Sequence, residues 1–136
     1  MVRHSILIAD DDDSQRSVQK LLLSDVATII NAELKIEEAA DSIVTRKAIS
    51  ERKYDLIILD NEFKDELKSG HLPGIAILQF MRKTGPNRSS PTVFLSGDPY
   101  NSLRPMVEKY GAIYYPKAKA DAEEMTKLYS KLLKSP

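Results

Sequence analysis

Several acidic residues in this sequence directly follow short apolar runs. The run Leu56 to Leu59 ends at Asp60, and the run Ile6 to Ala9 ends at four acids that begin with Asp10 and Asp11. A short, unbroken apolar run is typical of a strand that is covered on both faces, as in a parallel sheet. Because parallel strands present their carboxyl ends at one edge of the sheet, we expect the three carboxylates to converge there. Such a group is suited to binding a hard divalent cation, Mg²⁺ above all.

Two further polar residues follow apolar runs later in the chain. Ser96 follows the apolar residues 93–95 of the strand expected at 92–95, and Lys117 follows the run 112–115 and one proline. A carboxylate such as Asp60 can attack phosphorus without an activating base, because it is already ionised near neutral pH. A cation, the Lys117 ammonium and the Ser96 hydroxyl could then bind the oxygens of a transferred phosphoryl group. Each residue alone has an ordinary explanation as a loop acid, a turn residue or a surface lysine. Their common position at strand ends favours a shared site.

The hydrophobic pattern predicts five strands that alternate with five helices. The strands are expected at 4–9, 34–39, 54–59, 92–95 and 112–115, and the helices at about 14–31, 42–53, 74–84, 102–110 and 122–134. This alternation is typical of an α/β fold with a doubly wound five-stranded parallel sheet and helices on both faces. We therefore predict a single domain that spans residues 1–136.

The first predicted helix has an apolar repeat of about 3.6 residues, as an amphipathic helix should. Asp12 or Asp13 is expected to cap its first turn by accepting backbone N–H groups. The strand at 34–39 alternates apolar and charged residues, which is typical of an edge position. The buried face of the first helix is predicted to consist of Val18, Leu21, Leu22, Val26, Ile29 and Ile30.

The composition excludes several classes of protein. Lys plus Arg and Asp plus Glu both number 20, so the zero net charge gives no support for direct binding to nucleic acid or to an anionic membrane. The absence of cysteine excludes disulfides and thiolate metal sites. His4 and His71 are the only histidines, too few for a zinc site. Without a long apolar segment or a signal peptide, the chain is expected to be a cytoplasmic protein.

The strand-end motifs resemble those of the response-regulator receiver domain of two-component signalling. The similarity covers nearly the whole chain. The matching segments are 6–11 with Arg16, 55–60, 73–78, 93–97 and 114–117. The resemblance implies the flavodoxin-like receiver fold with strand order 2-1-3-4-5. It also implies a signalling domain that phosphorylates itself and slowly dephosphorylates, rather than a classical enzyme.

The resemblance assigns a role to each strand-end residue. Asp60 would be the phosphoacceptor, and Lys117 would bind the phosphoryl group. Mg²⁺ would be held directly by Asp11 and by Asp60, through water by Asp10, and by the backbone carbonyl of Glu62. The phosphoryl donor would be a histidine kinase or a histidine phosphotransfer protein.

The resemblance further implies a conformational switch. Ser96 would be the switch hydroxyl and Tyr114 the switch aromatic, which turns inward once Ser96 moves. The face formed by the fourth helix, the fifth strand and the fifth helix would then bind a downstream protein or a second copy of the chain. No output domain is expected within 136 residues.

Three features depart from the family pattern. The segment between Asp60 and Gly74 is long and holds a charged insertion at 64–71, which either serves partner recognition or is a tolerated loop. Lys117 precedes Ala118 instead of a proline, and a cis bond there would cost about 2.5–4 kcal/mol, so we expect a trans bond. The interval between the first acids and Asp60 is also long.

Two other functions are consistent with parts of the pattern. A pseudo-receiver that acts as a constitutive protein-docking module would have the same fold, although it would not need the complete set of strand-end residues. A haloacid-dehalogenase-like phosphatase also uses an aspartate at a strand end. That family has a second aspartate two residues later, where this sequence has Glu62.

Overall fold

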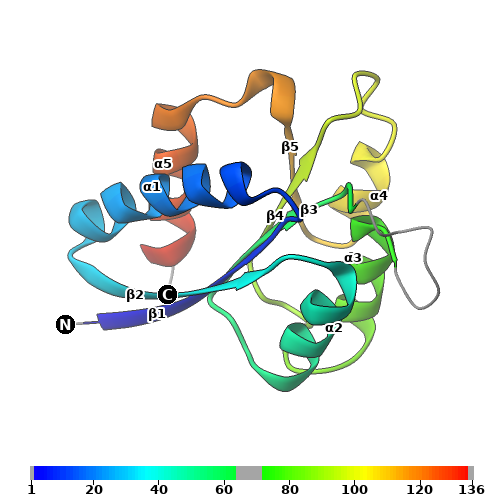
Figure 1. Cartoon of the computed structure of the whole chain (residues 1–136), viewed down its shortest axis with the longest axis horizontal. Coiled ribbons are helices and arrows are strands. Elements are labelled where there is room, and N and C mark those ends of the chain that lie inside the picture. The colour runs from blue at the N-terminus through cyan, green and yellow to red at the C-terminus, as the bar shows by residue number, and fades with distance from the viewer. Residues whose placement is uncertain (1, 64–71, 135–136) are drawn as a thin grey trace.

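The structure, a computed structural model, describes residues 2–63 and 72–134. Its strands are β1 (Val2–Ala9), β2 (Ala32–Ala39), β3 (Leu56–Asp60), β4 (Thr92–Ser96) and β5 (Ile113–Pro116). They form one parallel sheet in the order β2-β1-β3-β4-β5, which confirms the predicted topology (Figure 1). The predicted insertion at 64–71 lies outside the described residues.

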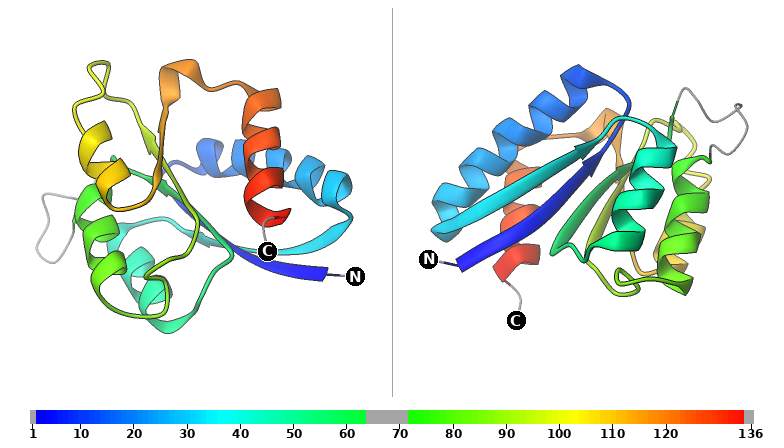
Figure 2. Two further views of the ribbon diagram at one scale, coloured as in Figure 1. Left: turned by 180° about the vertical axis from the view of Figure 1, so that it is seen from behind. Right: turned by 60° about the horizontal axis from the view of Figure 1, so that its bottom comes forward.

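Helices cover both faces of this sheet (Figure 2). They are α1 (Asp13–Ile30), α2 (Ser42–Glu51), α3 (Gly74–Lys83), α4 (Arg104–Lys109) and α5 (Ala122–Lys134), with a short 3₁₀ turn η1 (Lys117–Lys119). One hydrophobic cluster joins the sheet to α2, α3 and α4, and a second joins it to α1 and α5. No helix among the described residues is long and apolar enough to cross a membrane.

The central strand β3 is buried along its whole length. Ile57 and Leu59 belong to the cluster with α2, α3 and α4, while Leu56 and Ile58 belong to the cluster with α1 and α5. Successive side chains of a strand point to opposite faces, so this division follows from the continuous apolar run. The run therefore ends with the Asp60 side chain at the carboxyl edge of the sheet.

The predicted buried face of α1 was partly wrong. Val18, Leu21 and Ile29 are 47%, 70% and 56% exposed, whereas Arg16 and Gln19 are buried with Leu22, Leu23 and Val26. Apolar residues occur on two sides of this helix, and periodicity alone does not say which side meets the sheet. Gln19 is accommodated because its Oε1 accepts a hydrogen bond of 2.7 Å from the Tyr129 hydroxyl of α5.

Three local predictions were correct. Asp12 is the N-cap of α1, and its Oδ1 accepts hydrogen bonds from the backbone N–H groups of Ser14 and Gln15. Strand β2, with its alternating charges, lies at an edge of the sheet. Within the described ranges every peptide bond is trans, including the bond between Lys117 and Ala118.

Candidate functional site

Three carboxylates meet at the carboxyl edge of the sheet, as the sequence predicted. Asp10 and Asp11 follow β1, and Asp60 ends the neighbouring strand β3. One carboxylate oxygen from each lies within 4.8 Å of the others. Negative charges this close repel each other unless a cation or protons compensate them. The oxygen-only donor set fits a hard cation such as Mg²⁺, which takes carboxylate ligands and keeps several waters.

Asp60 is fixed by neighbours on both carboxylate oxygens. Its Oδ1 lies 2.6 Å from the Lys117 Nζ, and its Oδ2 accepts a hydrogen bond of 3.2 Å from the backbone N–H of Glu62. The Asp60 side chain is only 2% exposed, while that of Lys117 is 32% exposed. The carboxylate therefore presents a defined orientation, and the lysine retains access to solvent.

Burial sets the direction of the pKa shift for the two buried aspartates, but not for Lys117. It raises the pKa of Asp60 from 3.8 to about 7, and the contact with Lys117 only partly opposes that change. Burial also raises the pKa of Asp10, against the hydrogen bond from the Asp12 N–H. Burial of Lys117 would lower its pKa, but the Asp60 carboxylate outweighs this and raises it. A divalent cation would favour the ionised carboxylates and so bring Asp60 to the form that can attack phosphorus.

Ser96 lies at the same edge. The register of β3 and β4 pairs Asp60 with Leu95, so the buried Ser96 is one residue beyond this pair. Its Oγ accepts a hydrogen bond of 3.2 Å from the backbone N–H of Asp98. The hydroxyl hydrogen is therefore available to donate to a group bound beside Asp60.

Two glycines allow close approaches that were not predicted from the sequence. A Cβ at Gly74 would lie 2.3 Å from the Asp60 carbonyl oxygen, because α3 begins against the backbone that follows β3. A Cβ at Gly97 would lie 2.8 Å from Oε1 of Glu62. The Glu62 carboxylate thus lies over Gly97, next to Ser96. The sequence signal was a glycine directly after a strand-end serine and another after Pro73.

Tyr114 differs from the expectation of a side chain that turns inward only after a switch. It is already buried, with 6% exposure, and its ring stacks on Phe94 with the centroids 6.4 Å apart. The Arg104 guanidinium of α4 lies 5.9 Å from the centroid of the Tyr114 ring. The ring is enclosed because β5 and α4 pack against each other. In this structure the Tyr114 ring is therefore not in an exposed position from which it could turn inward.

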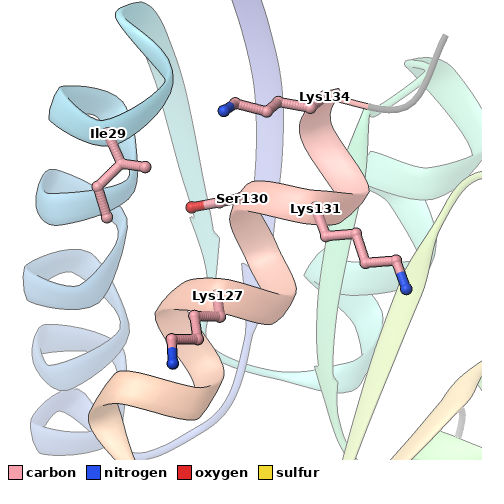
Figure 3. A pocket seen from close by; sticks show the side chains of 5 residues that line it. All are labelled: Ile29, Lys127, Ser130, Lys131 and Lys134. Atoms are coloured by element: carbon pink, nitrogen blue, oxygen red, sulfur yellow. The ribbon is translucent and has the colours of Figure 1, made fainter.

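A groove between α1 and α5 has a volume of about 490 Å³. Figure 3 shows Ile29 of α1 on one side and four α5 side chains on the other, and the groove is lined by Ile29, Lys127, Ser130, Lys131 and Lys134. None of these is a predicted site residue or an acid. The groove lining therefore includes none of the three carboxylates at the carboxyl edge of the sheet.

No protein-family model and no curated protein matches the sequence. Solved structures do match. The chain is 22% identical to the receiver domain of a Francisella response regulator, with a TM-score of 0.70 and coverage of 96% of this chain and 97% of that one. It is 18% identical to the receiver domain of a sensor histidine kinase from Pseudomonas aeruginosa PAO1, with a TM-score of 0.76 and coverage of 98% and 100%. That domain was solved with a magnesium ion coordinated in its active-site cleft.

A third similar structure is the response regulator TrrA from Thermotoga maritima in complex with Mg²⁺-BeF. It is 22% identical, with a TM-score of 0.72 and coverage of 98% of this chain and 100% of that one. Similarity at this level of identity over whole chains establishes the fold. Together with the strand order 2-1-3-4-5, it shows that this chain has the CheY-like fold of response-regulator receiver domains.

Proposed function

We propose that this chain is a phosphoacceptor receiver of a two-component or phosphorelay system, with Asp60 as the acceptor. The observation that carries the proposal is the environment of Asp60. Its carboxylate shares the sheet edge with Asp10 and Asp11 and contacts the Lys117 ammonium at 2.6 Å. This arrangement combines a nucleophile, a place for a cation and a positive group for phosphoryl oxygens. The donor would be the phosphohistidine of a kinase or of a phosphotransfer protein.

The reaction exchanges one bond to phosphorus for another. A carboxylate oxygen of Asp60 attacks the phosphorus, an O–P bond forms, and the N–P bond of the donor histidine breaks. Mg²⁺ held by Asp10, Asp11, Asp60 and the Glu62 carbonyl would neutralise charge on the transferred oxygens. Lys117, which now contacts Asp60 Oδ1, would contact a phosphoryl oxygen. Slow attack of water on phosphorus would break the new O–P bond, release inorganic phosphate and regenerate the Asp60 carboxylate.

The signal would leave the site through Ser96. The phosphoryl group adds negative charge and acceptor oxygens, so the Ser96 hydroxyl, whose Oγ accepts from the Asp98 N–H, would donate its hydrogen to a phosphoryl oxygen and be drawn toward Asp60. Movement of the segment after β4 would shift α4, whose Arg104 covers the Tyr114 ring. The face formed by α4, β5 and α5 would then bind a downstream protein or a second copy of the chain. Such a change is a population shift between two packings.

Labelling with acetyl phosphate tests the proposal. The wild-type protein with Mg²⁺ should gain the mass of one phosphoryl group, and both EDTA and Asp60→Asn should abolish the gain. Asp25→Asn, which changes a carboxylate on α1 away from the acidic edge formed by Asp10, Asp11 and Asp60, should be labelled like the wild type. Absence of labelling in the wild type would favour a pseudo-receiver that acts as a docking module. Labelling that survives Asp60→Asn would show that the acceptor is another residue.

A further inference from the structure

Arg16 of α1 lies next to the acidic edge, and its side chain is only 11% exposed. A charged side chain with this degree of burial needs several partners. We infer that Arg16 is a positioning residue that orients Asp10 and Asp11 for cation binding. The inference rests on the proposed function in one respect: the bound cation is the Mg²⁺ that would coordinate the phosphoryl oxygens.

The Arg16 guanidinium joins three separate parts of the fold. Its Nη1 donates a hydrogen bond of 2.6 Å to the Asp10 carbonyl, and its Nε donates one of 3.1 Å to Oε1 of Glu38 on β2. Its Nη2 pairs with the Asp13 carboxylate in the first turn of α1. The rigid planar fork of arginine can serve three acceptors in fixed directions. Arg16 therefore fixes the loop after β1 relative to β2 and α1.

The contact with the Asp10 carbonyl acts directly on the ligand set. The backbone N–H of Asp10 donates to the Ala39 carbonyl at 3.0 Å, and its Oδ1 accepts from the backbone N–H of Asp12 at 2.9 Å. The carbonyl that Arg16 holds belongs to the peptide plane that joins Asp10 to Asp11. Because a peptide is planar, the orientation of that plane sets the direction in which Asp11 leaves the chain. Arg16 thus determines how the two carboxylates face Asp60.

A positioning role and a purely electrostatic role have opposite consequences. A positive charge near the carboxylates, acting through charge alone, would repel Mg²⁺, and its removal would strengthen Mg²⁺ binding. The Arg16 charge is, however, compensated by Asp13 and Glu38. If Arg16 orients the loop, its removal should weaken Mg²⁺ binding. Partners that orient metal ligands are typically worth about 10- to 100-fold in metal affinity.

Two variants of Arg16 separate these roles. Arg16→Lys keeps the positive charge, but a lysine ammonium cannot reproduce the hydrogen bonds of the guanidinium to its three acceptors. Arg16→Met removes both the charge and these hydrogen bonds. Mg²⁺ is added to the metal-free proteins while the amide resonances of Asp11 and Asp60 are followed by NMR. We expect both variants to bind Mg²⁺ at least about tenfold more weakly than the wild type. Unchanged affinity in Arg16→Lys, or tighter binding in Arg16→Met, would overturn the inference.

Arg52 provides a matched control for general destabilisation. Like Arg16, Arg52 binds a glutamate of β2: Arg16 binds Glu38, and Arg52 binds the neighbouring Glu37. The Arg52 Nε donates to Glu37 Oε2 at 3.0 Å and to the Tyr54 hydroxyl at 3.2 Å. The described contacts of Arg52 do not include any of the three acids at the edge. Arg52→Lys should therefore lower the unfolding temperature and leave the Mg²⁺ affinity unchanged. A loss of Mg²⁺ affinity equal to that of Arg16→Lys would reduce the role of Arg16 to fold stability.

A second measurement needs no metal, so it separates failure of this inference from failure of the proposed function. The Asp12 N–H donates to Asp10 Oδ1, and its hydrogen exchange reports on the geometry of the loop. In metal-free protein, Arg16→Lys should accelerate this exchange more than Arg52→Lys does. If the wild type did not respond to Mg²⁺, the proposed function would fail, and this exchange would still decide whether Arg16 fixes the loop. Equal exchange in both variants would overturn the inference.

Discussion

The Lys117 Nζ lies 2.6 Å from the Asp60 Oδ1 and joins the residue after β5 to the end of β3. The two strands are not neighbours, because β4 lies between them. The contact keeps a positive charge beside a buried carboxylate, yet burial still raises the pKa of Asp60 to about 7. The ionised form of Asp60 is therefore disfavoured in the unliganded site, and a bound cation would stabilise it.

Substitution of Asp60 by Asn should stabilise the protein at alkaline pH. The pKa of Asp60 is about 7 in the folded state and ordinarily 3.8, so the folded state binds more protons between these values. The free energy of unfolding contributed by this group therefore falls as the pH rises from about 4 to about 7. Asp60→Asn removes that loss and should raise the free energy of unfolding at pH 8 by up to about 4 kcal/mol.

Urea unfolding at pH 4 and pH 8 measures this effect, with Asp25→Asn as the control. The gain should be small at pH 4, where the wild-type carboxyl is largely protonated. A variant less stable than the wild type at pH 8 would show that the contact with Lys117 outweighs the cost of burial.

Binding of Mg²⁺ should weaken as the pH falls below 7. The cation needs ionised carboxylates, whereas the pKa values of Asp60 and Asp10 are both raised by burial. Each proton displaced on binding lowers the apparent affinity by about tenfold per pH unit in this range. Calorimetric titration at pH 8, 7 and 6 in a buffer of constant ionic strength checks the slope. An affinity independent of pH would contradict the raised pKa of Asp60, because no proton would then be displaced.

The residues at the sheet edge could be predicted because a parallel sheet brings the ends of its strands together. The apolar runs before Asp10, Asp60 and Ser96 are enough to place them at one edge. The orientation of α1 could not be predicted in the same way. Leu21 and Leu23 are equally apolar in sequence, and only packing against the sheet and α5 decides that Leu23 is the buried one.

The contacts of Arg16 could not be predicted either. Glu38 is 22 residues away in sequence and lies on a strand that pairs with β1 in the fold. The contact between Arg16 and Glu38 can be predicted only once the register of β1 and β2 is known. The same holds for Gly74, whose close approach to the Asp60 carbonyl depends on where α3 begins.

Gly74→Ala should destabilise the protein and distort the site. Its Cβ would lie 2.3 Å from the Asp60 carbonyl oxygen and 2.7 Å from Asn61 Cα, so backbone atoms would have to move. We expect a loss of about 2–4 kcal/mol in the free energy of unfolding and weaker Mg²⁺ binding, because Asp60 moves with its backbone. Urea unfolding and Mg²⁺ titration measure the two effects.

Gly111→Ala is the control for Gly74→Ala. A Cβ at Gly111 meets nothing within 4 Å, but its φ of +73° is unfavourable for alanine. This variant should lose only about 1 kcal/mol and bind Mg²⁺ normally. Equal losses in the two variants would mean that α3 can withdraw from the Asp60 backbone at little cost.

The exposed side of α1 should contribute to binding of the phosphodonor protein. Leu21 is 70% exposed and Val18 is 47% exposed, on a helix that begins directly after the acidic edge. A donor protein must approach this edge to bring its phosphohistidine to Asp60, and exposed apolar side chains nearby are natural contacts. Leu21→Lys should therefore lower the rate of transfer from a donor protein that phosphorylates the wild type, by about tenfold.

Two comparisons isolate this effect. Acetyl phosphate needs no docking surface, so it should label Leu21→Lys as rapidly as the wild type. Ile29→Lys introduces the same charge eight residues further along, near the C-terminal end of the helix, where the side chain is 56% exposed, and should leave transfer from the donor protein unchanged. Equal transfer rates for Leu21→Lys and the wild type would exclude this side of α1 from the docking surface. A slow reaction of Leu21→Lys with acetyl phosphate would instead show that the substitution disturbs the site itself, since α1 carries Arg16 five residues before Leu21.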